Sequence, residues 1–128
     1  DVTEWARVIA VNLTATYLTC KHALRPMVEQ RSGSIVTVAS VEGLEGTEGG
    51  SAYNASKGGV VVLTKNMAID YGRLGVRVNC VTPAAVKTAM CDQMTQSHID
   101  FMLSKIPMGR LGQVREVASL VCWLASEE

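Results

Sequence analysis

Residues 34–59 read SIVTVASVEGLEGTEGGSAYNASKGG, and this one stretch predicts a strand, a loop and the start of a helix. The first seven residues are rich in β-branched side chains and contain no proline, which is typical of a buried strand ending at Ser40. The next ten residues contain four glycines and three glutamates and can only form a loop. We therefore expect Ser40 at the carboxyl end of a strand and Tyr53 at the start of the next helix. In open α/β sheets, the ligand crevice lies outside the carboxyl ends of the strands.

Tyr53 and Lys57 are four residues apart, and positions i and i+4 share one face of a helix. A fixed cation beside a tyrosine favours the phenolate, so the phenol becomes a usable proton donor and acceptor near neutral pH. Ser40, thirteen positions before Tyr53, could hold a carbonyl or alkoxide oxygen while Tyr53 passes the proton. Nothing in the chain carries hydride, so a cofactor must supply it. The pair on its own also occurs by chance, as a partly exposed tyrosine beside a solvated lysine.

The rest of the chain alternates between helical and extended patterns, which predicts the α/β class with a parallel sheet and right-handed crossovers. A first helix is expected from about residue 3 to residue 30, with Thr3 as its cap, a bend at Pro26 and Gly33 closing it. The remaining expectations are a strand at about 34–39, a helix at 53–71, a turn at Gly72 and Gly75, a strand at 76–82, an irregular segment around Pro83, a short helix within 92–104, a turn at 107–109 and a helix at 114–125.

Composition narrows the function classes. Twelve acidic and twelve basic residues leave no net charge, which gives no electrostatic reason to expect nucleic acid or a membrane surface as a partner. No apolar run is long enough to span a membrane and no targeting segment is visible at Asp1, so we expect a cytoplasmic protein. The two histidines, His22 and His98, lack neighbouring ligand patterns, and we predict no metal site. The four cysteines lack metal or redox spacing and are expected to be reduced thiols in the core; they are Cys20, Cys80, Cys91 and Cys122.

Several motifs in order resemble one family. They are residues 5–13 (WARVIAVNL), Ser40 with VEG after it, Tyr53 with Lys57, residues 79–88 (NCVTPAAVKT), GRLG at 109–112, EVA at 116–118 and LAS at 124–126. Together they resemble the C-terminal portion of a short-chain dehydrogenase/reductase, a family of NAD(P)-dependent oxidoreductases on a Rossmann fold. The resemblance implies a doubly wound parallel sheet and makes residues 1–128 the C-terminal part of one domain. The family's glycine-rich phosphate loop would precede residue 1 and its final strand would follow residue 128, so the sheet is expected to be incomplete.

The resemblance also assigns the site. It implies that Ser40 orients the substrate oxygen, Tyr53 transfers its proton, and Lys57 favours the phenolate and binds the nicotinamide ribose. Asn12 matches the family asparagine that holds a water linking the lysine to solvent, whereas the residues alone also allow it to cap or bridge two elements. Cofactor contacts, to NAD or NADP, are carried over to Tyr53, Lys57, Pro83, Val86 and Thr88. The family usually has Pro-Gly where this chain has Pro83-Ala84, so a turn that requires positive φ would be strained or reshaped here.

Two further segments have open interpretations. Gly58 and Gly59 each cost about 1 kcal/mol in a helix relative to alanine, so a close approach is expected there. It could be a homo-oligomeric interface, dimer or tetramer, as the resemblance implies, or tight packing on the chain's own sheet. Residues 89–108 carry four of the six methionines and by resemblance form a mobile lid over the substrate; an amphipathic helix sealing the core is compatible with that. The methionines are Met90, Met94, Met102 and Met108.

The functional expectation is an NAD(P)-dependent oxidoreductase that interconverts an alcohol and a carbonyl in a sugar, polyol or 3-oxoacyl substrate. The competing interpretation is a truncated, non-catalytic chain that serves at most as an oligomerisation module. Intact mass separates the two, because a mass near the 13.7 kDa of this chain favours the module and about twice that mass favours the enzyme. The isolated 128 residues are not expected to bind dinucleotide appreciably, because they contain no phosphate loop.

Overall fold

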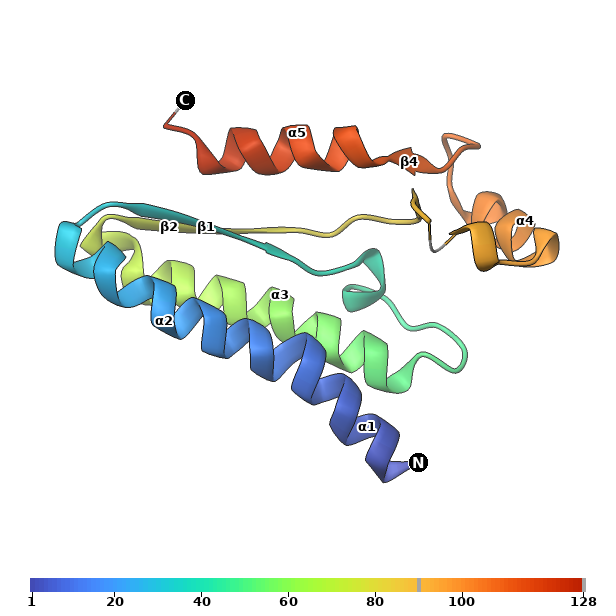
Figure 1. The fold of residues 1–128 in the computed structure, drawn as a ribbon, viewed down its shortest axis with the longest axis horizontal. Coiled ribbons are helices and arrows are strands. Elements are labelled where there is room, and N and C mark those ends of the chain that lie inside the picture. Colours follow the sequence, from blue (N-terminus) through green and yellow to red (C-terminus); the bar gives the residue numbers. More distant parts are fainter. Residues whose placement is uncertain (90, 128) are drawn as a thin grey trace.

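Helices and strands alternate along the chain in the computed structural model, which describes residues 1–89 and 91–127 (Figure 1). The order is α1 (Val2–Ile9), a π-helical turn (Ala10–Thr14), α2 (Ala15–Gln30), β1 (Gly33–Val38), a 3-10 helix (Val41–Gly43), α3 (Ser51–Tyr71), a 3-10 helix (Gly72–Leu74), β2 (Val76–Val81), β3 (Val86–Lys87), a 3-10 helix (Cys91–Gln93), α4 (Gln96–Lys105), β4 (Gly112–Gln113) and α5 (Val114–Ala125). Within the described part of the chain, no helix is both long and apolar enough to cross a membrane.

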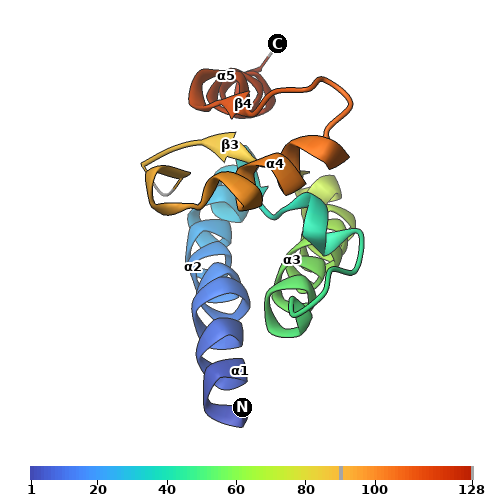
Figure 2. The same ribbon diagram turned by 90° about the vertical axis from the view of Figure 1, so that its right-hand side faces the viewer.

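Two parallel strands divide the molecule into layers. β1 and β2 pair in parallel, with Ile35 opposite Val78 and Thr37 opposite Cys80. Figures 1 and 2 show α2 and α3 side by side on one face of this pair, and α5 on the other face. Because the strands are parallel, the loops that follow β1 and β2 emerge at the same edge. The predicted α/β class with a parallel sheet is therefore confirmed.

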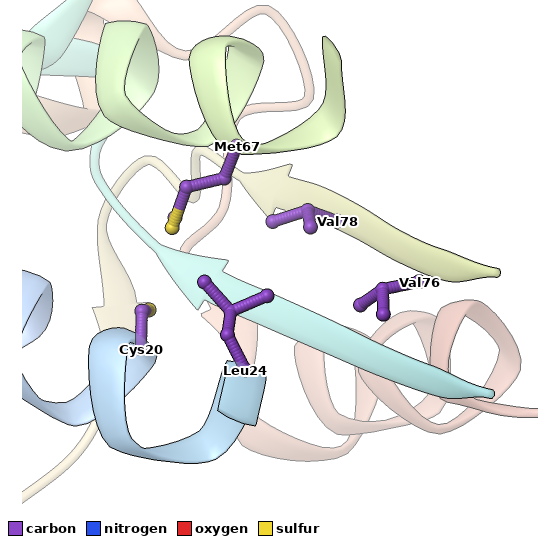
Figure 3. Packing of buried hydrophobic residues seen from close by; sticks show 5 residues of the cluster. All are labelled: Cys20, Leu24, Met67, Val76 and Val78. Atoms are coloured by element: carbon purple, nitrogen blue, oxygen red, sulfur yellow. The ribbon is translucent and has the colours of Figure 1, made fainter. Parts of the chain in front are cut away.

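The main core lies between the strands and the α2–α3 layer. It consists of the buried side chains Cys20, Leu24, Met67, Val76 and Val78, which converge in Figure 3. A second cluster lies nearer the carboxyl ends of the strands and contains Ala39, Val60 and Val61. Apart from Leu24 and Met67 these side chains are small, so the helices pack close to the sheet and hold the ends of β1 and α3 near each other.

The first helical segment starts one residue earlier than expected and has a different cap. The carboxylate of Asp1 accepts a hydrogen bond from the Glu4 N–H at 2.8 Å, so Asp1 caps the helix and Thr3 lies within α1. Aspartate is a strong N-cap because its carboxylate accepts from an otherwise unpaired N–H of the first turn. The prediction of Thr3 as the cap is therefore wrong. The π-helical turn at Ala10–Thr14 was not predicted.

The end of α2 also differs from the expectation. Arg31 closes the helix in the left-handed conformation, with φ of 54°, and Pro26 lies inside the helix. Gly33 is instead the first residue of β1, so its prediction as the helix terminator is wrong. A Cβ atom at Gly33 would approach the Met27 side chain to 2.5 Å, which explains a glycine there without a left-handed backbone.

The other boundaries follow the sequence pattern closely. The strands are shifted or shortened by one residue, and α3 begins two residues before the expected start at residue 53. The turn at Gly72 and Gly75 is confirmed, with Gly75 at φ of 84°, and α5 has the bounds expected. The pair β3–β4 was not predicted, because two-residue strands have no periodicity to detect. Arg77 of β2 joins α5 to the sheet by donating to the Leu124 carbonyl at 2.9 Å.

Candidate active site

The loops after β1 and β2 meet directly. The N–H of Ala39 donates to the Val81 carbonyl at 2.9 Å, and the N–H of Val41 donates to the Pro83 carbonyl at 3.1 Å. Ser40 lies between these two contacts, at the carboxyl edge of the strands as expected. Its side chain is buried, and its Oγ accepts a hydrogen bond from the Glu42 N–H at 3.2 Å. Accepting this bond uses an oxygen lone pair, so the hydroxyl proton of Ser40 can still donate to a substrate oxygen.

Tyr53 and Lys57 share one face of α3, as their spacing predicts. The Lys57 Nζ lies 5.7 Å from the centroid of the Tyr53 ring and donates to the Val38 carbonyl at 3.1 Å. Tyr53 is 39% exposed, whereas Lys57 is partly buried. Burial lowers the pKa of Lys57 from its ordinary value, and the charge interaction with Cys80 opposes this shift. The ammonium is thus held between the end of β1 and the tyrosine ring.

Asn12 lies in the π-helical turn and connects it to the first turns of α3. Its Nδ2 donates to Ser56 Oγ at 3.1 Å, and the Ser56 hydroxyl donates to the Tyr53 carbonyl at 2.7 Å. The main-chain carbonyl of Asn12 accepts from the Thr16 hydroxyl at 2.7 Å. The residues alone allowed Asn12 to cap or to bridge two elements, and in the structure it bridges the π-helical turn and α3. Ser56 is fully buried and was missed, although its place between Tyr53 and Lys57 on the helix was a usable signal.

A cavity of about 580 Å³ opens beside Ser40 and Tyr53. The loop after β1 contributes Glu42, Glu45 and Thr47 to its lining, and the α4 region contributes Phe101, Met102, Lys105 and Ile106. The methionine-rich segment thus borders the cavity through Met102, while Met108 is exposed and Met90 lies outside the described residues. Asn12 and Lys57 do not line the cavity but support the residues that do. The glutamates and Lys105 were not predicted, because they lie in separate segments.

The loop wall of this cavity is fixed to α3 by one side chain. Asn54 follows Tyr53 directly, and its Nδ2 donates to the Glu45 carbonyl at 2.9 Å and contacts the Thr47 hydroxyl at 3.2 Å. A Cβ atom at Gly50 would collide with the side chains of Asn54 and Thr47, so the loop closes tightly over this contact. The glycine-rich loop therefore holds a defined position next to Tyr53.

The residues expected to contact the cofactor lie just beyond β2. The Pro83 carbonyl is paired with the Val41 N–H. Val86 is in β3, where its carbonyl accepts from the Cys91 thiol at 3.2 Å, and Thr88 is exposed. Ala84 lines the cavity. Among the described residues, Arg31 is the only non-glycine with a left-handed φ, so alanine at position 84 causes no backbone strain of that kind.

The paired glycines of α3 have contacts within the chain. A Cβ atom at Gly59 would lie 2.7 Å from Leu13 Cδ2, and one at Gly58 would lie 3.3 Å from the Gly43 carbonyl oxygen. The expected close approach is therefore present, and its partners are the π-helical turn and the loop after β1. This packing accounts for both glycines without requiring a second copy of the chain.

The cysteines and histidines stand apart from the cavity. All four cysteines are free thiols, but of the four only Cys20 is buried, and Cys122 is exposed, so the prediction that they lie in the core is wrong for the other three. Burial raises the pKa of Cys20. Both histidines are exposed. Among residues 1–89 and 91–127, no cluster of three or more histidine, cysteine, aspartate or glutamate side chains could hold a metal ion.

Comparison with known proteins gives consistent matches over the whole chain. A family model described as enoyl-(acyl carrier protein) reductase matches residues 1–128. The 2-dehydro-3-deoxy-L-rhamnonate dehydrogenase (NAD(+)) of Sphingomonas sp. (strain SKA58) is 45% identical over 127 residues, covering 99% of this chain and 51% of that protein. The 3-oxoacyl-(acyl-carrier-protein) reductase FabG of Vibrio harveyi is 42% identical over 125 residues, covering 98% and 51%. The chain thus spans about half the length of the curated relatives it matches.

A solved structure has the same arrangement. The crystal structure of gox2181 matches with a TM-score of 0.94 at 34% identity, over 98% of this chain and 51% of that chain. This likeness supports the α/β fold and extends over almost all of residues 1–128.

Proposed function

Because the chain belongs to the short-chain dehydrogenase/reductase family, we propose that residues 1–128 are the C-terminal part of a single Rossmann-fold domain of an NAD(P)-dependent oxidoreductase. The observation that supports this most is that Ser40 and Tyr53 line one cavity, with the Lys57 ammonium beside the Tyr53 ring. The proposed reaction interconverts an alcohol and a carbonyl in a sugar, polyol or 3-oxoacyl-type substrate. Relatives named for a sugar acid and for a 3-oxoacyl thioester support this range.

In the proposed mechanism, the chain acts on the substrate oxygen. The Ser40 hydroxyl donates a hydrogen bond to the carbonyl oxygen, and the Tyr53 hydroxyl gives it a proton as the alcohol forms. In the reverse direction, the Tyr53 oxygen accepts that proton. Lys57 favours the phenolate form of Tyr53 through its fixed charge. The nicotinamide cofactor, when bound, supplies or accepts the hydride at the substrate carbon.

The residues at the carboxyl edge of the sheet fit a nicotinamide cofactor. Lys57 has three N–H donors, and the structure uses one of them for the Val38 carbonyl. The others can donate to ribose hydroxyls next to Tyr53. Pro83, Val86 and Thr88 would hold the nicotinamide end from the segment after β2. Asn12 would complete a proton relay from Lys57 through water, in addition to its bridge to Ser56.

We also propose a homo-oligomeric, cytoplasmic protein. The outer surfaces of the α2–α3 layer carry exposed apolar side chains, of which Val62 is 64% and Ile69 79% exposed. Exposed apolar area of this kind favours association with another copy. Four free thiols are consistent with a reducing compartment. Light scattering on a full-length protein containing this chain would measure the oligomeric state.

Replacing Tyr53 with phenylalanine tests the proposed proton transfer. The change keeps the ring but removes the transferable proton, so kcat should fall by about 100-fold or more while dinucleotide affinity remains. The control is Tyr17→Phe, which alters an exposed tyrosine on α2 outside the cavity. The assay is dinucleotide absorbance in a full-length protein containing this chain. Near-normal turnover by Tyr53→Phe would show that Tyr53 is not the acid–base residue.

Replacing Lys57 with methionine separates its two proposed roles. Loss of the charge should move the rise in activity to higher pH, because the phenolate is then less favoured. Loss of the ribose contact should also weaken dinucleotide binding, measured by calorimetric titration. Lys65→Met is the matched control, since Lys65 is exposed on the same helix. If the pH profile moves while binding does not, the ribose contact is wrongly assigned.

A further inference from the structure

The cavity beside Ser40 and Tyr53 has charges of both signs in its lining. Glu42 and Glu45 come from the loop after β1, and Lys105 comes from the last turn of α4. The loop and α4 come together at the same end of the molecule in Figure 1. None of these three charged groups belongs to the proton-transfer set of Ser40, Tyr53 and Lys57. Charged groups in a substrate cavity determine which substrate groups can bind there.

Lys105 is held at the cavity without a compensating carboxylate. Its Nζ lies 4.7 Å from the centroid of the Phe101 ring, one helical turn earlier. Both residues line the cavity and are exposed, and the cation–π contact favours a position of the ammonium at the cavity wall. Within residues 1–89 and 91–127, no carboxylate pairs with Lys105. The ammonium is therefore available to an anionic substituent of a ligand.

The two glutamates offer acceptors to a ligand. Glu42 accepts only a long contact from the Thr47 hydroxyl, at 3.4 Å. The Glu45 backbone is fixed by Asn54, while its carboxylate has no hydrogen-bond donor among the described residues. Ionised carboxylates only accept hydrogen bonds, so they can bind the hydroxyl groups of a ligand. They also repel another carboxylate, which directs an anionic group of the substrate away from the loop and towards Lys105.

We propose that the substrate is a polyhydroxylated carboxylic acid whose carboxylate binds Lys105 and whose hydroxyls donate to Glu42 and Glu45. The proposal rests on the oxidoreductase function above and narrows its substrate class. An acyl thioester offers less to these residues, because it has no carboxylate for Lys105 and no set of hydroxyls for Glu42 and Glu45. A cavity of about 580 Å³ is of the size that small-molecule ligands occupy.

The test compares six-carbon aldonic acids with the alditols of the same carbon skeletons, using a full-length protein containing this chain with NAD⁺ and NADP⁺. The members of each pair differ only in a terminal carboxylate or hydroxymethyl group. We expect kcat/KM to favour the aldonates by about tenfold or more, because a charge-assisted hydrogen bond changes affinity by about that factor. Lys105→Met should remove this preference through KM, Lys105→Arg should restore it, and Lys65→Met should leave it unchanged. Preference for alditols, for amino sugars or for an acetoacetyl thioester would overturn the proposal.

A binding measurement keeps this inference separate from the proposed chemistry. In the Tyr53→Phe background, which blocks proton transfer, calorimetric titration with the same aldonate should still show binding that Lys105→Met weakens by about tenfold. Normal turnover by Tyr53→Phe would refute the proposed mechanism. It would not affect the proposed recognition of the acid by Lys105, which the calorimetric titration alone tests. Equal affinity with and without the Lys105 ammonium would refute the recognition even if Tyr53 is essential.

Discussion

Replacing Gly43 with alanine tests the contact that joins the serine loop to the helix carrying Tyr53. A Cβ atom at Gly43 would lie 2.7 Å from the Lys57 carbonyl carbon, 2.8 Å from its oxygen and 2.9 Å from the Gly58 nitrogen. All three are backbone atoms of a helix, so none can rotate away. Ordinary contact begins at 3.4 Å, so the loop and α3 must separate by about 0.7 Å, the difference between 3.4 and 2.7 Å.

Moving the loop away from α3 should lower the unfolding free energy of the protein and should lower its kcat/KM more strongly. Forcing one extra methyl group into a packed contact costs about 1–3 kcal/mol. For a domain of about 150–250 residues, each kcal/mol lowers Tm by about 2–4 °C. Ser40 precedes Gly43 by three residues and Tyr53 lies one turn before Lys57, so the shift changes the distance between the two reacting hydroxyls. Misplacement by about 1 Å can reduce a rate about 100-fold, and we expect kcat/KM to fall by about tenfold to 100-fold.

The matched control is Gly46→Ala in the same loop. A Cβ atom at Gly46 meets nothing within 4 Å, and its backbone is not left-handed. Alanine at this position reduces the conformational entropy of the unfolded chain, so Tm should stay the same or rise slightly. Activity should not change. Both variants are measured by thermal unfolding and by dinucleotide-coupled turnover in a full-length protein containing this chain. If Gly43→Ala matches Gly46→Ala in Tm and kcat/KM, the loop does not rest on the α3 backbone as described.

Two further changes test the stability of the fold. Hydrogen bonds from Arg110 and the Gln113 N–H lower the pKa of Glu116 from 4.5 to about 2. Because the pKa is lower in the folded state than in the unfolded state, ionised Glu116 stabilises the fold above pH 4.5, and this stabilisation is lost as the pH falls towards 2. The difference in unfolding free energy between wild type and Glu116→Gln should therefore shrink across that window, and a constant difference in chemical denaturation would contradict the assignment. Thr37→Val removes a buried hydroxyl contact of 2.6 Å to Thr64 and should lower the unfolding free energy by about 1 kcal/mol. The control is Thr19→Val, which should change it less, because the hydrogen bond from the Thr19 hydroxyl to the Ala15 carbonyl is exposed to water.

The fold was predictable where the sequence pattern is local. The strand before Ser40 and the helix after the glycine loop follow from composition over a few residues, and α5 has the bounds that its apolar spacing indicates. The errors occur at helix ends. Asp1 caps α1 where Thr3 was expected, and Arg31 closes α2 where Gly33 was expected. Asp1 and Thr3 both have suitable capping chemistry, so the sequence alone does not decide between them. Arg31 takes the left-handed position that usually favours glycine, while Gly33 lies in β1 next to Met27.

The candidate site likewise contains residues that the local sequence pattern predicts and residues that only non-local packing brings together. Tyr53 and Lys57 are one helical turn apart, and Ser40 ends a strand, so their placement follows from local geometry. Lys105 lies more than fifty residues after Tyr53, and no periodicity links it to Glu45. Their common cavity depends on how α4 docks near the loop after β1, which is a non-local result of packing. The sequence therefore predicted the proposed chemistry of the site but not the side chains that we propose to select a substrate.

For Asn12, the sequence indicates a need for hydrogen-bond partners and the structure identifies them. An amide inside a helix is unfavourable unless its donors and acceptor are satisfied, so the sequence could indicate only that Asn12 needs partners. The structure supplies Ser56, forty-four positions away, and through it the Tyr53 carbonyl. The π-helical turn places this amide, and such turns recur at functional sites because their longer spacing displaces side chains from regular positions. The hydrogen bonds of the partly buried Asn12 amide and the buried Ser56 hydroxyl thus also hold the helical turn that carries Tyr53, so folding energy and the proposed acid–base geometry depend on the same contacts.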